Sequence, residues 1–348
     1  MIPRWFERVC VIGLLLLAVW LRTFELRTLP PGFSNRELRA IDITGQIRSG
    51  TVQVFFPLQP DGAEASFYHT ASAAITALVG DGTLGYRLLG LWANLLALAF
   101  LYAATRALFG PGIGLVSLAI MVTGIWSVLL SRTVSPLSLV PLFVCSTLAI
   151  MTWTFRLYQP IAPTPPLTTR YTVLGFLIGG AIYTHYVGLL LALILLLFVV
   201  YLRRTNQPVS RRVWSSSLFA LTLILVLSLP YIISVLRNPT ITGIYLLWKD
   251  RPTGVIPFLE SILKTFSGFA YSGDSSPTHN VPNLPLLWPI WFLLTLVGFY
   301  FALRRWREPA YGMLLIMLVV GLLPDIWLDG GPSFPDMLLV QPILYILT

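Results

Sequence analysis

Long apolar runs repeat from one end of this sequence to the other. Many approach the roughly 17 to 25 residues that a helix needs to cross a hydrocarbon core about 30 Å thick. Of the 348 residues, 56% are hydrophobic and only 11% are charged, a composition that excludes an ordinary soluble domain. Backbone polar groups in lipid must be satisfied within their own segment, so the sequence predicts an all-α, polytopic helical membrane protein.

The first span is expected over residues 9–26. Arg4 and Arg8 precede it as in a signal peptide, but no small-residue cleavage pattern follows, so this helix is expected to be retained. Further spans, to make about ten, are expected near residues 84–106, 113–130, 136–155, 171–184, 187–202, 214–236, 285–303 and 310–328. A last apolar run begins at Met337 and has no closing loop, so residues 1–348 are interpreted as one membrane domain that continues beyond Thr348.

Residues 66–79 decide which loops share a side of the membrane. As a helix this segment is about 21 Å long, too short to cross the bilayer. If it stays on the outer side, the N-terminus and all the later basic clusters fall on the cytoplasmic side, as the positive-inside rule requires. These clusters are Arg106, Arg156, Arg203-Arg204, Arg211-Arg212 and Arg304-Arg305-Trp306-Arg307. The net charge of +9 is therefore interpreted as a topology signal and not as a nucleic-acid-binding surface.

The distinctive loops then meet on the outer face. They are residues 27–83, 131–135, 183–186, 237–284 and 329–336. The connections on the cytoplasmic side are short or contain no distinctive motif. The sequence has no Walker motif and no GxGxxG before a helix, which weighs against a nucleotide-driven pump. This asymmetry predicts chemistry or binding at the outer membrane surface.

The first outer loop, residues 27–83, is the most polar long segment of the chain. A Pro-Pro-Gly turn at residues 30–32 ends the preceding helix. A short amphipathic helix is expected to begin at Ser34 or Asn35, either of which can cap it, with Glu37 in its first turn. The loop continues through Asp61 and Glu64 to a Phe-Tyr pair that ends at Tyr68.

Carboxylates in these loops are the first candidates for chemistry. They are Glu37, Asp42, Asp61, Glu64 and Asp274. A carboxylate at the lipid interface can act as a general base on an acceptor hydroxyl or bind a divalent cation. The alternative is a solvated loop charge or a helix cap.

Arginines at the same interface form the second group: Arg36, Arg39, Arg87 and Arg132. Arginine contacts phosphate through two parallel hydrogen bonds and stays charged when partly buried. The alternative is that each side chain extends to the lipid headgroups.

Histidines and cysteines give weaker signals. In the loop that ends His279-Asn280, the imidazole could donate to a phosphate, or the pair could satisfy backbone groups. His69 and His185 are too scattered to indicate a zinc site, and no metal site is assigned. Cys10 and Cys145 lie inside apolar spans and are interpreted as small core hydrophobes.

The order of these motifs resembles a known group. A first helix is followed by Pro-Pro-Gly with an acidic amphipathic helix, a Gly-x-Glu before Phe-Tyr, a span from Arg87 and a Ser-Arg turn. A Tyr-Thr-x-Tyr turn and a late loop with Phe269, Gly273-Asp274 and His-Asn-x-Pro come after these. This order resembles the polyprenyl-phosphate-dependent glycosyltransferases of the GT-C superfamily, of the protein O-mannosyltransferase, aminoarabinose transferase and RgtA/B/C/D-like type. The resemblance covers nearly the whole chain.

The resemblance implies an enzyme of the plasma (inner) membrane of the cell envelope, with its active face outward. It implies inverting transfer of a hexose or pentose from a polyprenyl-phosphate donor to a hydroxyl of a lipid, glycan or protein acceptor. Glu37 would be the catalytic base, with Glu64 assisting, and a divalent cation could take part. Substrate-binding residues would be Arg36, Asp42, Tyr68, His69, Arg87, Arg132, Asp274, His279 and Asn280. Alignment and a base can supply much of the barrier reduction, because the leaving phosphate is already an anion.

The chain also departs from the family pattern. Arg36 stands where relatives have the first acid of an Asp-Glu pair, Ser135 and Thr278 replace charged residues, and residues 330–335 contain no arginine. These departures support a second hypothesis, a non-catalytic scaffold of the same fold that binds lipid or partners. A transporter is disfavoured, because the spans hold almost no ionisable residues at mid-membrane depth.

Overall fold

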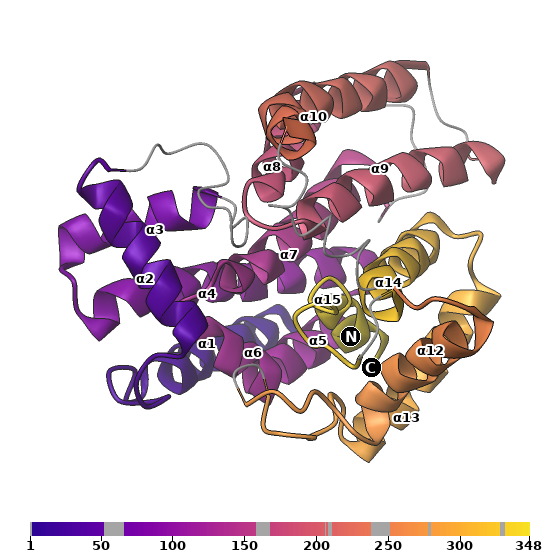
Figure 1. Ribbon diagram of the computed structural model, residues 1–348. Helices are drawn as coiled ribbons and strands as arrows, with labels where there is room; N and C mark the ends of the chain where they lie inside the picture. The colour runs from indigo at the N-terminus through magenta and orange to yellow at the C-terminus, as the bar shows by residue number, and fades with distance from the viewer. Residues whose placement is uncertain are drawn as a thin grey trace.

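Helices make up the regular secondary structure of the described residues, as the apolar runs predict. The computed structural model describes residues 2–51, 66–157, 168–205, 207, 211–237, 251–277, 280–327 and 331–348. The all-α class is therefore confirmed, and the arrangement is shown in Figure 1. In chain order the elements are α1 (Arg4–Thr23), α2 (Asn35–Arg48), α3 (Ser66–Val79), α4 (Thr83–Phe109), α5 (Pro111–Thr123), α6 (Ile125–Ser131), the 3₁₀ helix η1 (Pro136–Leu139), α7 (Val140–Thr154), α8 (Thr168–Ile182), α9 (Val187–Arg204), α10 (Arg211–Arg237), α12 (Val255–Ala270), α13 (Pro289–Arg304), α14 (Pro309–Trp327) and α15 (Gln341–Leu347).

Five stretches of the described chain are long and apolar enough to cross a membrane: α4, η1 with α7, α9, most of α10, and α14. The pair α5 and α6 qualifies as a sixth if its 60° bend at Gly124 lies within one span. The chain is thus an integral membrane protein by composition, and the expected total of about ten spans remains a prediction.

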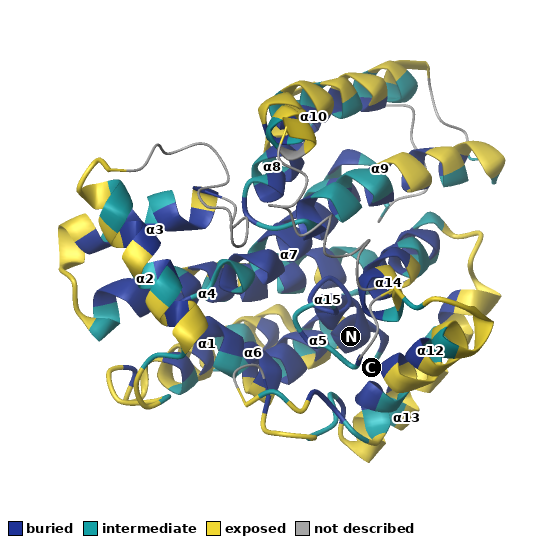
Figure 2. Cartoon of the chain, viewed as in Figure 1, coloured by how far each residue is buried: buried dark blue, intermediate teal, exposed yellow. Residues whose placement is uncertain are grey.

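The centre of the bundle is α4 packed against α7. Ala97, Leu98 and Leu101 of α4 are fully buried, as are Leu148 and Met151 of α7. Figure 2 shows both helices largely dark blue, whereas α10 and α12 are yellow over much of their outer surface. Gly175 and Gly179 of α8 allow a close approach of α10. A Cβ at Gly179, for example, would lie only 2.8 Å from Leu227 Cδ1.

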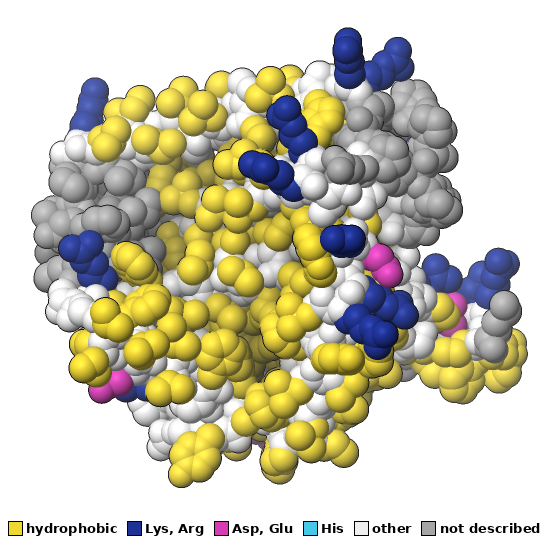
Figure 3. All heavy atoms as spheres, turned by 90° about the vertical axis from the view of Figure 1, so that its right-hand side faces the viewer, with side chains coloured by type: hydrophobic (Ala, Val, Ile, Leu, Met, Phe, Trp, Pro, Cys, Tyr) yellow, Lys and Arg dark blue, Asp and Glu magenta, His cyan; other side chains and the backbone are white. Residues whose placement is uncertain are grey.

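The outward surface is apolar. On α13, Ile290, Leu293 and Val297 are each more than half exposed. In Figure 3 hydrophobic side chains cover much of the visible face, and Lys and Arg lie mainly over its upper and right-hand parts. Apolar surface on this scale is not stable in water. It fits contact with lipid.

The basic clusters named from the sequence lie together at one end of the bundle, which we call the basic end. Arg106, near the end of α4, bonds Glu7 at the start of α1. Tyr201 Oη, near the end of α9, donates to the Trp306 carbonyl (2.7 Å). The ring of Phe109 contacts that of Tyr311 at 5.2 Å. We call the opposite end, where α1, α8 and α14 finish, the loop end.

The helix α3 has the predicted bounds and does not run the length of the bundle. Its start is tied to the turn between α8 and α9, because the Phe67 N–H donates to the Tyr183 carbonyl (3.0 Å). Its other end is joined to the start of α4 by residues 80–82. Both ends of α3 therefore lie at the loop end. Because α3 does not cross, the basic clusters before and after it lie at the same end of the bundle.

Two expectations need correction. Residues 237–284, expected as a long loop, contain the 16-residue α12. This helix buries Ser261 and Thr265 and exposes Ile256 and Leu263, so its apolar face points outward. The final apolar run, expected as a span, forms a turn and the seven-residue α15. Residues 337–347 are buried throughout, against other helices.

Candidate functional site

Two hollows at the loop end share one side chain, Trp126. The first, which we call the polar cavity, has a volume of about 350 Å³ and is lined by the Pro-Pro-Gly turn, the first turn of α2, α6, residues 133–137, Pro277 and Pro335. The second, which we call the tryptophan groove, has a volume of about 330 Å³ and lies between α5–α6 and residues 284–291. Trp126 lines both, and its ring contacts that of Phe334 at 5.2 Å.

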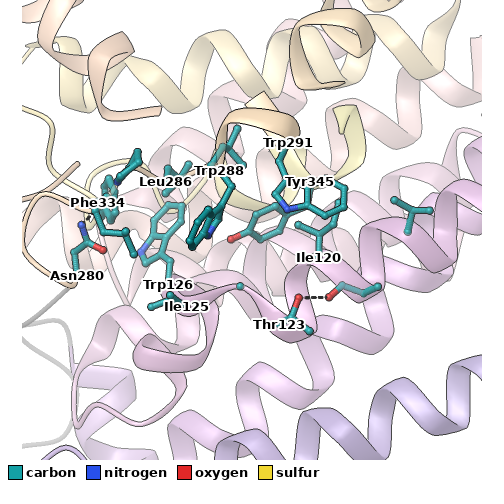
Figure 4. A pocket seen from close by; sticks show the side chains of 16 residues that line it. Ile120, Thr123, Ile125, Trp126, Asn280, Leu286, Trp288, Trp291, Phe334 and Tyr345 are labelled. Carbon is teal, nitrogen blue, oxygen red and sulfur yellow. Dashed lines mark hydrogen bonds between the residues drawn. The ribbon is translucent and has the colours of Figure 1, made fainter. Parts of the chain in front are cut away.

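The tryptophan groove is almost entirely apolar. In Figure 4 the side chains of Trp126, Trp288 and Tyr345 face one another across the hollow, and Asn280 and Phe334 lie at one end of it. The groove exists because the helix breaks at Gly124, where a Cβ would lie 3.1 Å from Tyr345 Oη.

That break is braced by a buried arginine that the sequence analysis did not single out. Arg22 of α1 is fully buried and donates to the carbonyls of Met121 and Val122 (both 3.2 Å), which the end of α5 leaves without helical partners. It also donates to Asn94 Oδ1 and Ser127 Oγ (both 2.9 Å).

Glu37, the expected base, lines the polar cavity and is 7% exposed. Ser34 caps α2 as predicted, and Glu37 closes a capping box with it: Glu37 Oε2 accepts from Ser34 N (2.8 Å) and from Ser34 Oγ (2.9 Å). Its other oxygen, Oε1, accepts from the Val134 N–H (2.9 Å). The carboxylate therefore joins the α2 cap to the turn after α6.

Arg87 is fully buried and holds the turn that forms one wall of the cavity. Nη1 donates to the carbonyls of Leu26 (2.7 Å) and Leu29 (2.8 Å), and Nη2 to those of Pro30 (2.8 Å) and Gly32 (3.0 Å). A phosphate contact by this guanidinium would have to replace these bonds.

Arg132 serves the same turn from the other side. Its guanidinium donates to the carbonyls of Leu21 (3.1 Å), Phe24 and Leu29 (3.3 Å). Burial lowers its pKa below the ordinary value. Arg87 and Arg132 thus support the cavity wall, and Arg36, which is exposed, is the only cation among the described residues that line the cavity.

Three other expected residues of the first outer loop, Asp42, Tyr68 and His69, line neither hollow. Asp42 is exposed and accepts from Gln46 Nε2 (2.8 Å) on the same helix. Tyr68 and His69 are fully buried at the start of α3, with their rings 5.3 Å apart. Glu64 falls outside the described residues, and so does His279.

Asp274 and Asn280 organise the loop after α12. Asp274 Oδ1 accepts from Ser276 N (2.7 Å) and Oδ2 from Phe334 N (3.1 Å). Asn280 Nδ2 donates to the carbonyls of Asp274 (3.0 Å) and Leu284 (2.7 Å). These bonds attach the loop to the segment 331–336, and Asn280 lines the tryptophan groove.

A pair of acids, Asp325 at the end of α14 and Asp336 in the segment 331–336, organises this segment and was not predicted from the sequence. Tyr186 Oη donates to Asp336, whose Oδ2 accepts from Ser333 Oγ (2.5 Å). Asp325 Oδ1 accepts from Ser333 N (2.6 Å) and Oδ2 from Thr265 Oγ1 (2.5 Å). Burial and the nearby Asp336 carboxylate raise the pKa of Tyr186 well above its ordinary value, so it stays a donor.

Neither the carboxylates nor the imidazoles of the described residues gather into a group of three or more that could hold a metal ion. His185, in the α8–α9 turn, packs on the Tyr186 ring at 4.2 Å. Burial lowers its pKa to about 4, so the imidazole is neutral at pH 7.

The described part of the chain is thus a helical bundle of a membrane protein, with two hollows at one end that share the side chain of Trp126. No family model matches the sequence, and no curated protein matches it. Its fold is similar to that of two solved structures.

The chain is similar to the oligosaccharyltransferase AglB from Archaeoglobus fulgidus, in complex with an inhibitory peptide and a dolichol-phosphate, with 12% identity and a TM-score of 0.68. It is also similar to ArnT from Cupriavidus metallidurans bound to undecaprenyl phosphate, with 17% identity and a TM-score of 0.68. Both matches cover 99% of this chain, which spans 50% of the AglB chain and 60% of the ArnT chain. At such identities the likeness establishes the fold.

Proposed function

We propose that this chain is the membrane domain of a glycosyltransferase that moves a sugar from a polyprenyl-phosphate donor to an acceptor hydroxyl, with inversion, at the loop end. One observation carries the proposal: the polar cavity that contains Glu37 and the apolar tryptophan groove meet at Trp126. A donor with a polar head and an isoprenoid tail needs two adjoining surfaces of these two kinds. The AglB and ArnT structures hold ligands of this chemistry, dolichol-phosphate and undecaprenyl phosphate.

In this proposal the isoprenoid tail lies in the tryptophan groove and the phosphosugar head in the polar cavity. Arg36 is exposed on the cavity and can approach the phosphate. Arg87 and Arg132 act indirectly, by holding the Pro-Pro-Gly turn. Tyr68, His69, Asp42 and the loop residues Asp274, His279 and Asn280 would shape the surroundings or bind the acceptor, which is a lipid, glycan or protein.

The chemistry requires one base. Glu37 takes the proton of the acceptor hydroxyl while that oxygen attacks the anomeric carbon, and the bond from this carbon to the phosphate oxygen breaks with its electron pair leaving on the phosphate. A carboxylate has about four acceptor sites, and three hydrogen bonds reach Glu37. One site therefore remains for the acceptor hydroxyl. Glu64 would assist this step. No step is assigned to a divalent cation.

The variant Glu37→Gln tests the proposal sharply, because glutamine can also complete a capping box but cannot accept a proton. We expect sugar transfer from a lipid-linked donor to fall by about a hundredfold or more in kcat. The free energy of unfolding should fall by about 1 to 2 kcal/mol, because the amide keeps only one of the two oxygens that accept hydrogen bonds from Ser34 and Val134. The matched control is Glu260→Gln, the same change at an exposed position of α12. Transfer at the wild-type rate by Glu37→Gln would remove this residue from the mechanism.

The proposed orientation places the loop end outside the inner membrane and the N-terminus in the cytoplasm. It can be tested with single cysteines at Tyr271, which is 86% exposed, and at Arg304 of the basic end, in a Cys10→Ser background. A membrane-impermeant maleimide added to intact cells should label the first cysteine and spare the second. The reverse pattern would place the site on the cytoplasmic face.

A non-catalytic scaffold is the second candidate, and a specific observation favours it: Glu37, Arg87 and Arg132 are all engaged with the protein's own backbone. This candidate predicts that the chain purifies with partners at fixed stoichiometry, holds no polyprenyl phosphate and transfers no sugar from any lipid-linked donor. Transfer by the wild type would exclude it.

A further inference from the structure

A third hollow opens at the basic end, where α4, α7 and α8 meet. It has a volume of about 300 Å³ and is lined by Phe100, Ile150, Trp153, Thr169, Arg170 and Val173. The loop-end site does not extend to it: along α4, Phe100 is thirteen residues from Arg87, about 20 Å as a helix. The proposed transferase chemistry therefore gives this hollow no role.

The walls of this hollow are apolar and partly exposed on the outer surface of the bundle. Phe100, Ile150 and Trp153 are half-buried. On α8, Val173 is 46% exposed and Phe176, one turn further on, is 56% exposed. An apolar dent that opens onto a lipid-facing surface has the right chemistry to hold part of an acyl chain.

The polar rim of the hollow suits an anion. Arg170 is half-buried, and its Nη1 donates to the Trp153 carbonyl (2.6 Å), which fixes the guanidinium beside the hollow. Its other N–H groups have no partner that the described residues reveal. The exposed Thr169 adds a hydroxyl, and both residues lie in the first turn of α8, where the helix dipole favours negative charge.

We propose that this hollow binds one anionic glycerophospholipid, with its phosphodiester on Arg170 and Thr169 and part of an acyl chain against Phe100, Ile150 and Trp153. The net positive charge of the basic end selects an anionic headgroup over a zwitterionic one, since basic pockets between membrane helices on the cytoplasmic side bind such headgroups. The proposal stands whether or not the chain transfers sugar.

Lipid binding to the purified full-length chain tests this proposal by native mass spectrometry, with phosphatidylglycerol and phosphatidylcholine as the two probes. We expect phosphatidylglycerol to be retained preferentially and Arg170→Gln to weaken its retention by about tenfold. Arg304→Gln removes the same charge from an exposed position of the basic end and is expected to change retention less than twofold. Val173→Trp, which fills the hollow and leaves every charge in place, should weaken retention as strongly as Arg170→Gln.

Four results would overturn the proposal. Equal effects of Arg170→Gln and Arg304→Gln would reduce the binding to general charge attraction. Equal retention of both lipids would show that the hollow does not distinguish an anionic headgroup from a zwitterionic one. Displacement of phosphatidylglycerol by millimolar inorganic phosphate would indicate a site for free phosphate and not for a lipid. If Arg170→Gln does not fold, the test rests on Val173→Trp. Full retention of phosphatidylglycerol by Val173→Trp would then contradict the proposal.

Discussion

Two buried arginines of the loop end and the arginines at three helix termini of the basic end have opposite surroundings. At the loop end, Arg22 and Arg87 are fully buried, and each donates to several backbone carbonyls. At the basic end the arginines at the ends of α9, α10 and α13 are exposed. The first group replaces hydrogen bonds that broken helices and turns have lost, whereas the second group interacts with water and headgroups.

This difference shows that the role of an arginine near a membrane surface cannot be inferred from the residue type or from its position along the helix. From the sequence, Arg87 and Arg132 were expected to bind phosphate. In the structure their guanidinium groups donate instead to backbone carbonyls in and before the Pro-Pro-Gly turn. Arg36, which stands where an acid was expected, is the cation exposed on the cavity. Four predictions test the contrast, from the largest expected effect to the smallest.

Removing a buried arginine at the loop end should destabilise the fold strongly. In Arg87→Ala, the carbonyls of Leu26, Pro30 and Gly32 lose the guanidinium that donates to them, whereas that of Leu29 keeps Arg132. We therefore expect the free energy of unfolding to fall by about 4 kcal/mol. Arg203→Ala at the basic end should cost less than about 0.5 kcal/mol. Thermal unfolding in detergent measures both, and similar losses in the two variants would contradict the contrast.

The loop end should lose stability between pH 6.5 and pH 4. Burial lowers the pKa of His185 from 6.5 to about 4, so between these values the unfolded chain binds a proton that the folded protein does not. The stability is complete above pH 6.5 and falls by about 3 kcal/mol on reaching pH 4. Unfolding followed against pH should show this fall in the wild type and its absence in His185→Gln.

The cation exposed on the cavity should affect donor binding and not folding. For Arg36→Gln we expect KM for a lipid-linked donor to rise about tenfold, with a smaller change in kcat, because a charge-assisted bond to the phosphate is lost. Arg27→Gln, an exposed arginine in the neighbouring turn, is the control. Steady-state kinetics that give the same KM for both variants would separate Arg36 from the donor.

The basic end should respond to acid in a different pH range. Hydrogen bonds from Arg106 and Tyr102 lower the pKa of Glu7 below its ordinary value of 4.5. The stability from this contact is complete above pH 4.5 and is lost as the pH falls through the lowered pKa. Compared with the wild type, Glu7→Gln should show a shallower loss of stability below pH 4.5. If both proteins follow the same curve in that range, Glu7 is not the titrating group.

Much of the architecture could be predicted because it depends on local patterns. The bounds of α3, the cap of α2 at Ser34 and the turn from Tyr183 to Tyr186 follow from residue type and spacing. The helix α12 was missed because it lies with its polar side inward, with Thr265 on Asp325, and a pattern read from sequence does not show which side is covered. Glu37 has a local partner in Ser34, but its partner Val134 and the carbonyls that bind Arg87 lie more than fifty positions away, so no local pattern contains them.

The sequence by itself determined that the chain is a helical membrane protein, which segments are apolar, and that the segment 66–79 is too short to cross, because length, hydropathy and charge are local properties. Tertiary structure alone decided which charged side chains remain exposed at a hollow and which satisfy the backbone. That outcome depends on where broken helices leave their carbonyls, and those positions exist only after the helices have packed.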